Sequence, residues 1–172
     1  MSETALSLFP LPRALAARGI SLRLQSGEDA AVQEALFVEA RRAEFDVLAW
    51  DEESKRDFLA HQSALQQRHY GLHYKGAELY TVLERGVPIG RFYIDRLSPS
   101  EIRLVDFIFF ATHRGTGLGT AFLEALLDEA GRSGKFVGLH VEEHNPARRL
   151  YQRLGFRDAA LRPPYIYMRR DP

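Results

Sequence analysis

The clearest chemical pattern in the chain is a glycine-rich turn that follows the apolar run FIFF at residues 107–110. The turn reads RGTGLGT at residues 114–120, and an amphipathic segment at 121–132 follows directly. Glycine has no Cβ, so the backbone can bend tightly here and approach a ligand closely. A helix that starts at such a turn offers unpaired N–H groups and the positive end of its dipole to an anion. The pattern is typical of a phosphate-binding loop, although it also occurs as an ordinary strand-to-helix turn.

Two well-known phosphate motifs do not fit this turn. A P-loop needs Gly-x-x-x-x-Gly-Lys-Ser/Thr, and no Lys-Ser or Lys-Thr pair follows the glycines. The dinucleotide fingerprint needs Gly-x-Gly-x-x-Gly early in a βαβ unit, with an acidic residue about 20 positions later. Here the glycines alternate at Gly115, Gly117 and Gly119 and lie late in the chain. Both classes of nucleotide-binding enzyme are therefore disfavoured.

A second motif lies downstream, from Asn145 through Leu150 and Tyr151 to Gly155-Phe156. Together with Arg114-x-x-Gly117-x-Gly119, it resembles the two signature motifs of the GNAT superfamily of acetyl-CoA-dependent N-acetyltransferases. The resemblance covers about residues 20–170. The spacing from Asn145 to Tyr151 is one residue shorter than in many relatives, whereas the Leu-Tyr…Gly-Phe register is intact.

Composition limits the class of protein and its partners. The chain has 172 residues, 45% hydrophobic and 27% charged, which fits one globular domain. The formal net charge of zero argues against nucleic acid or an anionic membrane as the main partner. The absence of cysteine excludes disulfides, thiolate metal sites and a cysteine nucleophile. The N-terminus carries Glu3, Pro10 and Pro12 and no basic residue before Arg13, so it is a poor signal peptide and a cytoplasmic protein is expected.

Hydrophobic periodicity divides the chain into short elements. It predicts a strand at 20–24, helices at 27–45 and 51–68, a hairpin at 78–84 and 87–96, a strand at 101–110, a helix at 121–132, a strand at 135–142 and a helix at 146–154. Two strand-like segments at 155–156 and 165–169 are predicted to close the chain. Residues 71–76 are predicted to be a turn region. The centre of segment 101–110 is apolar on both faces, as expected of a buried central strand.

This order of elements is that of the GNAT fold. The resemblance implies an α/β (α+β) architecture with a mixed, mostly antiparallel central sheet flanked by about four helices. The fourth and fifth strands, here 101–110 and 135–142, would run parallel and splay apart. Residues 19–172 are expected to form a single GNAT acetyltransferase domain, and residues 1–18 a short N-terminal arm that is able to move.

The resemblance places acyl-CoA between the two splayed strands. In the family, the pantetheine arm pairs with the fourth strand, and the offset from Arg114 gives as backbone partners Phe107, Ile108 and Phe109. The pyrophosphate would be bound by Arg114, Gly115, Thr116, Gly117, Leu118, Gly119 and Thr120, mainly through backbone N–H groups. Two alternatives stay open: the phenylalanine side chains also fit a hydrophobic core, and the Arg114 side chain fits either a phosphate contact or plain solvation.

Asn145 and Arg148 are further candidates for cofactor binding. Family members use this Asn to contact the pantetheine arm, whereas Asn followed by Pro146 also fits a helix N-cap with a first-turn proline. Both roles can hold together, because a capping side chain sits at the mouth of its helix. Arg148 and Arg149 could reach the ribose phosphate, or each could be an ordinary solvated arginine.

Tyr151 is the main catalytic candidate. In the family its hydroxyl protonates the leaving thiolate, which needs a weak acid beside a developing anion; the alternative is a core tyrosine on a short helix. Asp106 is the candidate for the base, or for a residue that orients the base. A carboxylate in the apolar run of 105–107 is costly to bury without a partner or a role. Weaker candidates for the base are Glu101, His140 and Glu142.

In the family, the helices corresponding to residues 27–68 help to line the acceptor pocket. The aromatic and histidine side chains of this region could receive an amine or could simply pack: Trp50, His61, His69, Tyr70, His73 and Tyr74. No motif here identifies the acceptor. The six histidines offer no His-x-x-x-His pair with a nearby acid, so no metal is expected.

The resemblance implies N-acetyl transfer from acetyl-CoA to a primary amine by direct attack, without a covalent enzyme intermediate. The acceptor would be a small molecule or a peptide, with no nucleic acid or membrane as partner. Homodimers are common in the family, and a homodimer is compatible with the sequence. The alternative is a non-catalytic acyl-CoA-binding or regulatory module of the same fold, because fold does not fix function.

Overall fold

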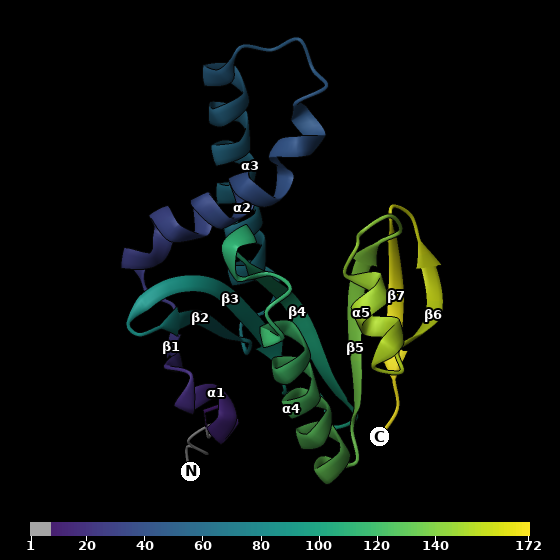
Figure 1. Cartoon of the computed structure of the whole chain (residues 1–172). Coiled ribbons are helices and arrows are strands. Elements are labelled where there is room, and N and C mark those ends of the chain that lie inside the picture. The colour runs from purple at the N-terminus through teal and green to yellow at the C-terminus, as the bar shows by residue number, and fades with distance from the viewer. Residues whose placement is uncertain (1–7) are drawn as a thin grey trace.

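The computed structural model describes residues 8–172 and contains one seven-stranded sheet in the order β1-β2-β3-β4-β5-β7-β6 (Figure 1). The elements in chain order are α1 (Arg13–Ala17), β1 (Ile20–Leu24), η1 (Gly27–Asp29), α2 (Ala30–Phe45), α3 (Glu52–His73), β2 (Glu78–Glu84), β3 (Val87–Asp95), β4 (Glu101–Phe109), η2 (Ala111–His113), α4 (Leu118–Ser133), β5 (Phe136–Glu142), α5 (Arg148–Arg153), β6 (Arg157–Arg162) and β7 (Tyr165–Arg170). Only the β4–β5 pair is parallel among these strands. The predicted mixed sheet with its parallel fourth and fifth strands is confirmed. Helix α1 was not predicted, and the strand expected at 155–156 lies instead at Arg157–Arg162. Within residues 8–172, no helix is long and apolar enough to cross a bilayer.

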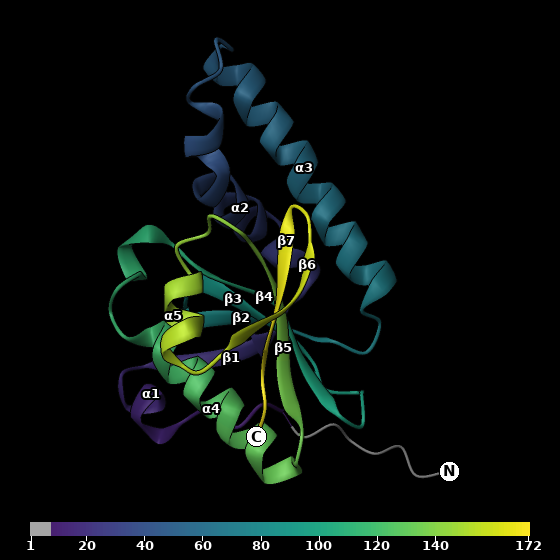
Figure 2. The ribbon, with the colours of Figure 1, turned by 90° about the vertical axis from the view of Figure 1, so that its right-hand side faces the viewer.

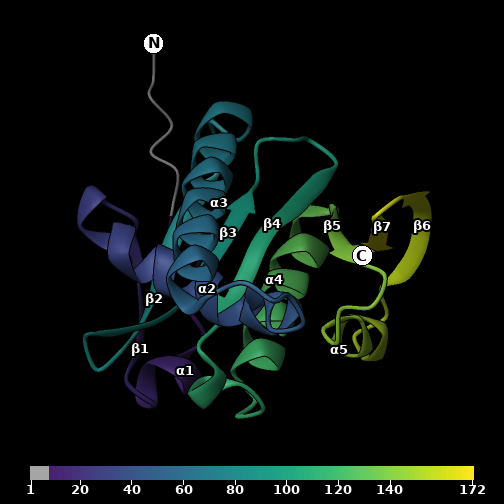
Figure 3. The same cartoon turned by 90° about the horizontal axis from the view of Figure 1, so that it is seen from above.

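The two faces of the sheet differ in chemistry. Helices α1, α4 and α5 cover one face, and α3 crosses the other (Figures 2 and 3). The first face is apolar, with side chains such as Phe92, Phe122 and Leu139 fully buried. On the second face, the buried Arg91 and Tyr93 of β3 hydrogen-bond to glutamines of α2 and α3. Apolar burial therefore stabilises one face, while the other presents buried polar groups.

Helix α3 is longer than predicted. The turn signals at Gly71 and Gly76 suggested an end near residue 68, but the helix continues to His73. Gly71 is tolerated inside the helix, at a modest cost in stability. The last turn is held by Tyr70, which is 9% exposed and donates a hydrogen bond to Asp106 at 2.9 Å. A tertiary contact has overridden the local signal.

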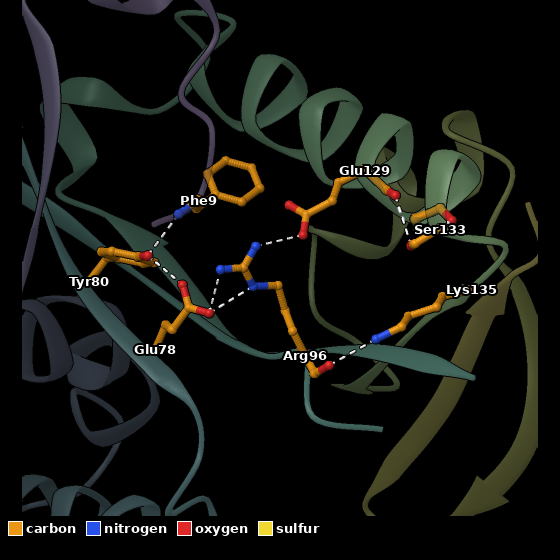
Figure 4. Close-up of polar contacts among 8 residues, drawn as sticks. Phe9, Glu78, Tyr80, Arg96, Glu129, Ser133 and Lys135 are labelled. Carbon is orange, nitrogen blue, oxygen red and sulfur yellow. Dashed lines mark hydrogen bonds and ion pairs between the residues drawn. The ribbon is translucent and has the colours of Figure 1, made fainter. Parts of the chain in front are cut away.

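Part of the expected N-terminal arm packs against the sheet (Figure 4). Phe9 is 4% exposed, and its ring lies 5.0 Å from that of Phe92. The N–H of Phe9 donates to the hydroxyl of Tyr80 at 2.9 Å. Leu15 of α1 is also buried. Residues 1–7 lie outside the described part of the chain.

A buried charge network joins this arm to the sheet and α4 (Figure 4). Arg96 lies 2.6 Å from both Glu78 of β2 and Glu129 of α4. Tyr80 donates a short hydrogen bond to Glu78. The ammonium group of Lys135 donates to the backbone carbonyl of Arg96 at 2.9 Å. One arginine thus compensates two carboxylates where β2, β3 and α4 meet.

We expect the free energy of unfolding to fall as the pH rises above about 10. Burial, and next the hydrogen bond to Glu78, raises the pKa of Tyr80 to about 12. A tyrosine in the unfolded chain has a pKa near 10, so above that pH the unfolded chain loses this proton first. The contribution of Tyr80 is therefore complete below pH about 10 and is lost as the pH rises through about 12. Urea unfolding between pH about 10 and about 12 measures this loss of unfolding free energy. An equally steep loss in Tyr80→Phe would show that Tyr80 is not its source.

Candidate active site

The candidate site lies where β4 and β5 separate (Figure 1). The two strands pair only over the first four residues of each. Beyond that point the register between β4 and β3 shifts by one residue. Ile94 pairs with Leu104, and Tyr93 pairs with Asp106. Val105 is therefore an extra residue in β4 with no partner in β3. A β-bulge of this kind bends its strand and disrupts local pairing. The predicted splay is confirmed, and the bulge accounts for its position.

The second half of β4 has a neighbouring strand on one side only. Its last residues pair with β3, while β5 beyond the splay pairs with β7. The β5-facing edge of Phe107 to Phe109 is therefore open to an extended ligand that pairs like a strand. The rings of Phe107 and Phe109 lie 5.7 and 6.0 Å from that of Phe122 in α4, so these side chains belong to the core.

The glycine-rich turn leads directly into α4. Gly115 and Gly117 have φ angles of +71° and +83°, which residues with a side chain rarely adopt. Helix α4 is 16 residues long, and its first turn has no side-chain cap. Within residues 8–172, no backbone N–H between Gly115 and Thr120 has a hydrogen-bond acceptor. Free donors at the positive end of a long helix fit a phosphate group.

Arg114 is engaged with the protein rather than simply solvated. Its Nε donates to the carbonyl of Phe109 at 2.8 Å, and its Nη2 lies 3.2 Å from Glu39 of α2. Glu39 also accepts a hydrogen bond from the N–H of Ala111 at 2.6 Å. The Arg114 side chain is 47% exposed. A phosphate contact by Arg114 stays a prediction, and it would have to compete with Glu39.

Replacing Gly117 by alanine is expected to weaken acetyl-CoA binding about tenfold, because a Cβ in the left-handed conformation costs about 1–2 kcal/mol. No atom lies within 4 Å of the added Cβ, so the effect would come from the backbone and not from a clash. Calorimetric titration with acetyl-CoA measures the loss. The matched control is Gly131→Ala, at a helical position in α4 with equally open space. Equal affinity in Gly117→Ala and Gly131→Ala would show that the loop conformation is not needed.

Asn145 caps the turn before α5. Its Oδ1 accepts the N–H of Ala147 at 2.9 Å, with Pro146 between them, but the N-cap residue of α5 itself is Ala147 and has no side-chain hydrogen bond. The regular helix begins at Arg148, two residues later than predicted, because the N–H groups of Arg148 and Arg149 bond to carbonyls three residues back. The side chain of Asn145 is exposed. Its contact with pantetheine stays a prediction.

Arg148 links α5 to its surroundings. Its guanidinium donates to the carbonyl of Glu143 at 3.1 Å and lies 2.8 Å from Asp158 of β6. Arg149 next to it is exposed. The contact of Arg148 or Arg149 with the ribose phosphate stays a prediction. The guanidinium of Arg148 already donates to two acceptors within the protein.

Tyr151 lies on α5 with its ring buried and its hydroxyl available. The residue is 8% exposed and packs against Phe156 at a centroid distance of 5.7 Å. Within residues 8–172 its hydroxyl has no hydrogen-bond partner, yet it is not fully enclosed. Burial, and next the negative charge of Asp106, raises the pKa of Tyr151. The phenol therefore stays protonated at neutral pH and lies within electrostatic reach of Asp106.

Asp106 has the partner that its apolar surroundings require. Its Oδ2 lies 2.7 Å from Nη2 of Arg91 and accepts the hydroxyl of Tyr70 at 2.9 Å. Among the described residues, its Oδ1 accepts no hydrogen bond, and this oxygen is not fully enclosed. The side chain is 17% exposed. One oxygen is thus held by the protein, and the other is available to a ligand.

The weaker base candidates are all engaged in polar contacts. Arg103 forms two contacts with Glu101, the shorter at 2.7 Å, and lies 2.9 Å from Nδ1 of His140. Because arginine can only donate, this Nδ1 acts as the acceptor. Burial, and next the charge of Arg103, lowers the pKa of His140. Glu142 pairs with Arg41 of α2 at 2.9 Å. Among the described residues, Asp106 and Glu142 each keep one carboxylate oxygen without a hydrogen-bond donor. Of these two, Asp106 is the more buried, with its side chain 17% exposed against 35% for Glu142.

Sequence reasoning missed two residues of this cluster. Arg91 lies in an otherwise apolar strand, and the argument applied to Asp106 would have singled it out as well. Tyr70 was noted only as part of the acceptor region, and its contact with Asp106 spans 36 positions. Of the three histidines in the same region, His69 and His73 stack at 4.3 Å on the exposed side of α3, and His61 is exposed.

The sequence matches the acetyltransferase (GNAT) family over residues 37–156, which is more than half of the chain. The chain belongs to the GNAT acetyltransferase family. The predicted family is therefore confirmed, and with it acetyl transfer as the general class of activity. No curated protein sequence matches this GNAT chain.

Solved structures share the GNAT fold at low sequence identity. The PaiA N-acetyltransferase from Thermoplasma acidophilum, in complex with coenzyme A, is 14% identical with a TM-score of 0.65, over 89% of this chain and 99% of that one. An acetyltransferase from Thermus thermophilus is 19% identical with a TM-score of 0.62, over 89% and 97%. Naa50 from Arabidopsis thaliana, in complex with a CoA-Ac-MVNAL bisubstrate analogue, is 14% identical with a TM-score of 0.56, over 90% and 99%.

Proposed function

We propose that the chain is an N-acetyltransferase that moves an acetyl group from acetyl-CoA to a primary amine by direct attack. The observation that carries the proposal is the pair of free groups at the splay: the protonated hydroxyl of Tyr151 and Oδ1 of Asp106. Transfer from a thioester to an amine requires a weak acid for the leaving thiolate and a base for the amine, and these two groups have the matching chemistry. The coenzyme A bound to the PaiA protein and the bisubstrate analogue bound to Naa50 support the choice of substrates.

The residues present fit acetyl-CoA. The free N–H groups between Gly115 and Thr120, at the uncapped start of α4, would hold the pyrophosphate. The open edge of β4 at Phe107 to Phe109 would pair with the pantetheine arm. Asn145 would contact the same arm from the mouth of α5. Acetyl-CoA supplies the thioester, whose carbonyl carbon the amine attacks.

Tyr151 and Asp106 would then move the protons. Oδ1 of Asp106 accepts a hydrogen bond from the acceptor nitrogen and takes its proton, directly or through a water. A backbone N–H of β4 polarises the carbonyl. The hydroxyl of Tyr151 gives its proton to the sulfur as the C–S bond breaks. The acceptor nitrogen loses two protons as an ammonium ion becomes an amide; one balances the proton on the thiol and the other is released to solvent.

The test is amine-dependent release of the CoA thiol from acetyl-CoA. The panel of acceptors is n-butylamine, spermidine, lysine methyl ester and a short peptide with a free N-terminus, and mass spectrometry identifies the acetylated product. We expect at least one amine to be acetylated, with loss of turnover in Asp106→Asn. If acetyl-CoA binds but no amine in the panel is acetylated, the non-catalytic acyl-CoA-binding module becomes the better account.

A further inference from the structure

The two carboxylate oxygens of Asp106 have different surroundings, because the neighbouring side chains contact only one of them. Both contacts, from Arg91 at 2.7 Å and from Tyr70 at 2.9 Å, end on the same oxygen, Oδ2. They come from different elements, β3 and α3, so they fix the plane of the carboxylate as well as its position. Oδ1 is left without a partner among the described residues and still has accessible surface.

Arg91 is itself held from both helices of the second face. It is 2% exposed, and its guanidinium donates to Gln33 Oε1 of α2 at 3.3 Å and to Gln66 Oε1 of α3 at 2.8 Å. A planar guanidinium fixed at several N–H groups cannot turn freely. Its charge compensates that of Asp106, which makes a carboxylate tolerable in this apolar strand.

Tyr70 is suited to be a permanent donor. Burial, and next the charge of Asp106, raises its pKa, so the phenol keeps its proton at neutral pH. Its ring is packed edge-on against Tyr93 at 5.5 Å, which fixes the direction of the hydroxyl. Tyr70 therefore cannot serve as a base, but it can hold Oδ2 in place.

We propose that Arg91 and Tyr70 are positioning residues that hold Oδ2 of Asp106, so that Oδ1 binds the acceptor as a cationic primary ammonium group. The inference deepens the proposed function and rests on it. A carboxylate oxygen can only accept, so its ligand must be a donor, and a charged N–H donor gives the strongest such hydrogen bond.

The first test uses Tyr70→Phe, which removes one hydroxyl and keeps the ring. In thiol release with the best amine of the panel, we expect kcat/KM for the amine to fall about tenfold, since a hydrogen bond to a charged group is lost. The KM for acetyl-CoA should not change. In an Asp106→Asn background, Tyr70→Phe should cause no further loss, because Tyr70 acts through that carboxylate. If the losses in kcat/KM caused by Tyr70→Phe and Asp106→Asn were fully additive in the double variant, the proposal would be overturned.

The matched control is Tyr80→Phe. Tyr80 is also a buried tyrosine that donates to a carboxylate, Glu78, but it lies in the network of Figure 4, away from the splay. Tyr80→Phe should keep wild-type kcat/KM. An equal fall in both variants would indicate a general structural effect and contradict the positioning role. Arg91→Lys, which keeps the charge without the planar fork, should retain part of the activity; if it does not fold, Tyr70→Phe still decides.

A second measurement needs no turnover. The Asp106 side-chain carboxyl, labelled with ¹³C, is followed by NMR with bound CoA while n-butylammonium chloride is added. We expect a saturable shift in the wild type and about tenfold weaker binding in Tyr70→Phe. No shift in the wild type would overturn the inference. If amine acetylation still depends on Tyr151 in that case, the proposed function stands and only the positioning role falls.

Discussion

Replacing Tyr151 by phenylalanine is expected to lower kcat about a hundredfold or more while acetyl-CoA affinity stays within about twofold, since a positioned general acid typically contributes at least that much. The variant removes only the hydroxyl, which has no partner among the described residues, and keeps the ring that packs against Phe156. Folding and cofactor binding should therefore be preserved. The raised pKa of Tyr151 keeps the proton available at neutral pH.

Steady-state kinetics measures kcat, and calorimetry measures the affinity for acetyl-CoA. Tyr165→Phe is the control, because Tyr165 is 43% exposed at the start of β7 and makes no hydrogen bond through its hydroxyl within residues 8–172. It should behave as the wild type. Unchanged kcat in Tyr151→Phe would mean that water or another group protonates the sulfur, and Tyr151 would then be a core tyrosine only.

Replacing Arg96 by methionine is expected to cost about 3–5 kcal/mol of stability, the usual cost of leaving a buried charge without its partner. Arg96 is bonded to both Glu78 and Glu129, and its side chain is 13% exposed (Figure 4). Methionine has a similar length but cannot compensate either carboxylate. Such a loss is a large fraction of the stability of an ordinary domain.

Urea unfolding at neutral pH measures this cost directly. Arg132→Met is the matched control, because Arg132 is an exposed residue in the last turn of α4 and its replacement should change little. A loss of less than about 1 kcal/mol in Arg96→Met would contradict the network as the structure has it. It would indicate that water already solvates the two carboxylates.

Most of the helices and strands were predictable because they have strong local patterns. The alternation in β1, the glycine-rich turn before α4 and the Asn145-Pro146 cap all depend on residues close together in sequence. The parallel β4–β5 pair followed from the family resemblance, not from local pattern. The helix α1 was not predicted, since Pro10 and Pro12 obscured a five-residue helix that is held by the burial of Leu15.

The site was predictable only in part. The position of Asp106 in an apolar strand correctly indicated a partner, because an unpaired buried carboxylate is costly. The identity of that partner could not be read, since Arg91 faces Asp106 only through the β3–β4 register and the bulge at Val105. The contact with Tyr70 further depends on how α3 crosses the sheet. Contacts between residues this far apart in the chain produce no recognisable pattern in the sequence.

The most direct test of the central claim is thermal unfolding of the wild-type protein with acetyl-CoA, with CoA and NAD as comparisons. A ligand at 100 times its Kd should add about 2.7 kcal/mol of stability, which raises the Tm of a domain of this size by several degrees. We expect acetyl-CoA and CoA to raise the Tm and NAD to leave it unchanged. No rise with acetyl-CoA, or an equal rise with NAD, would contradict the assignment of residues 114–120 as its pyrophosphate site and the acetyl transfer that depends on it.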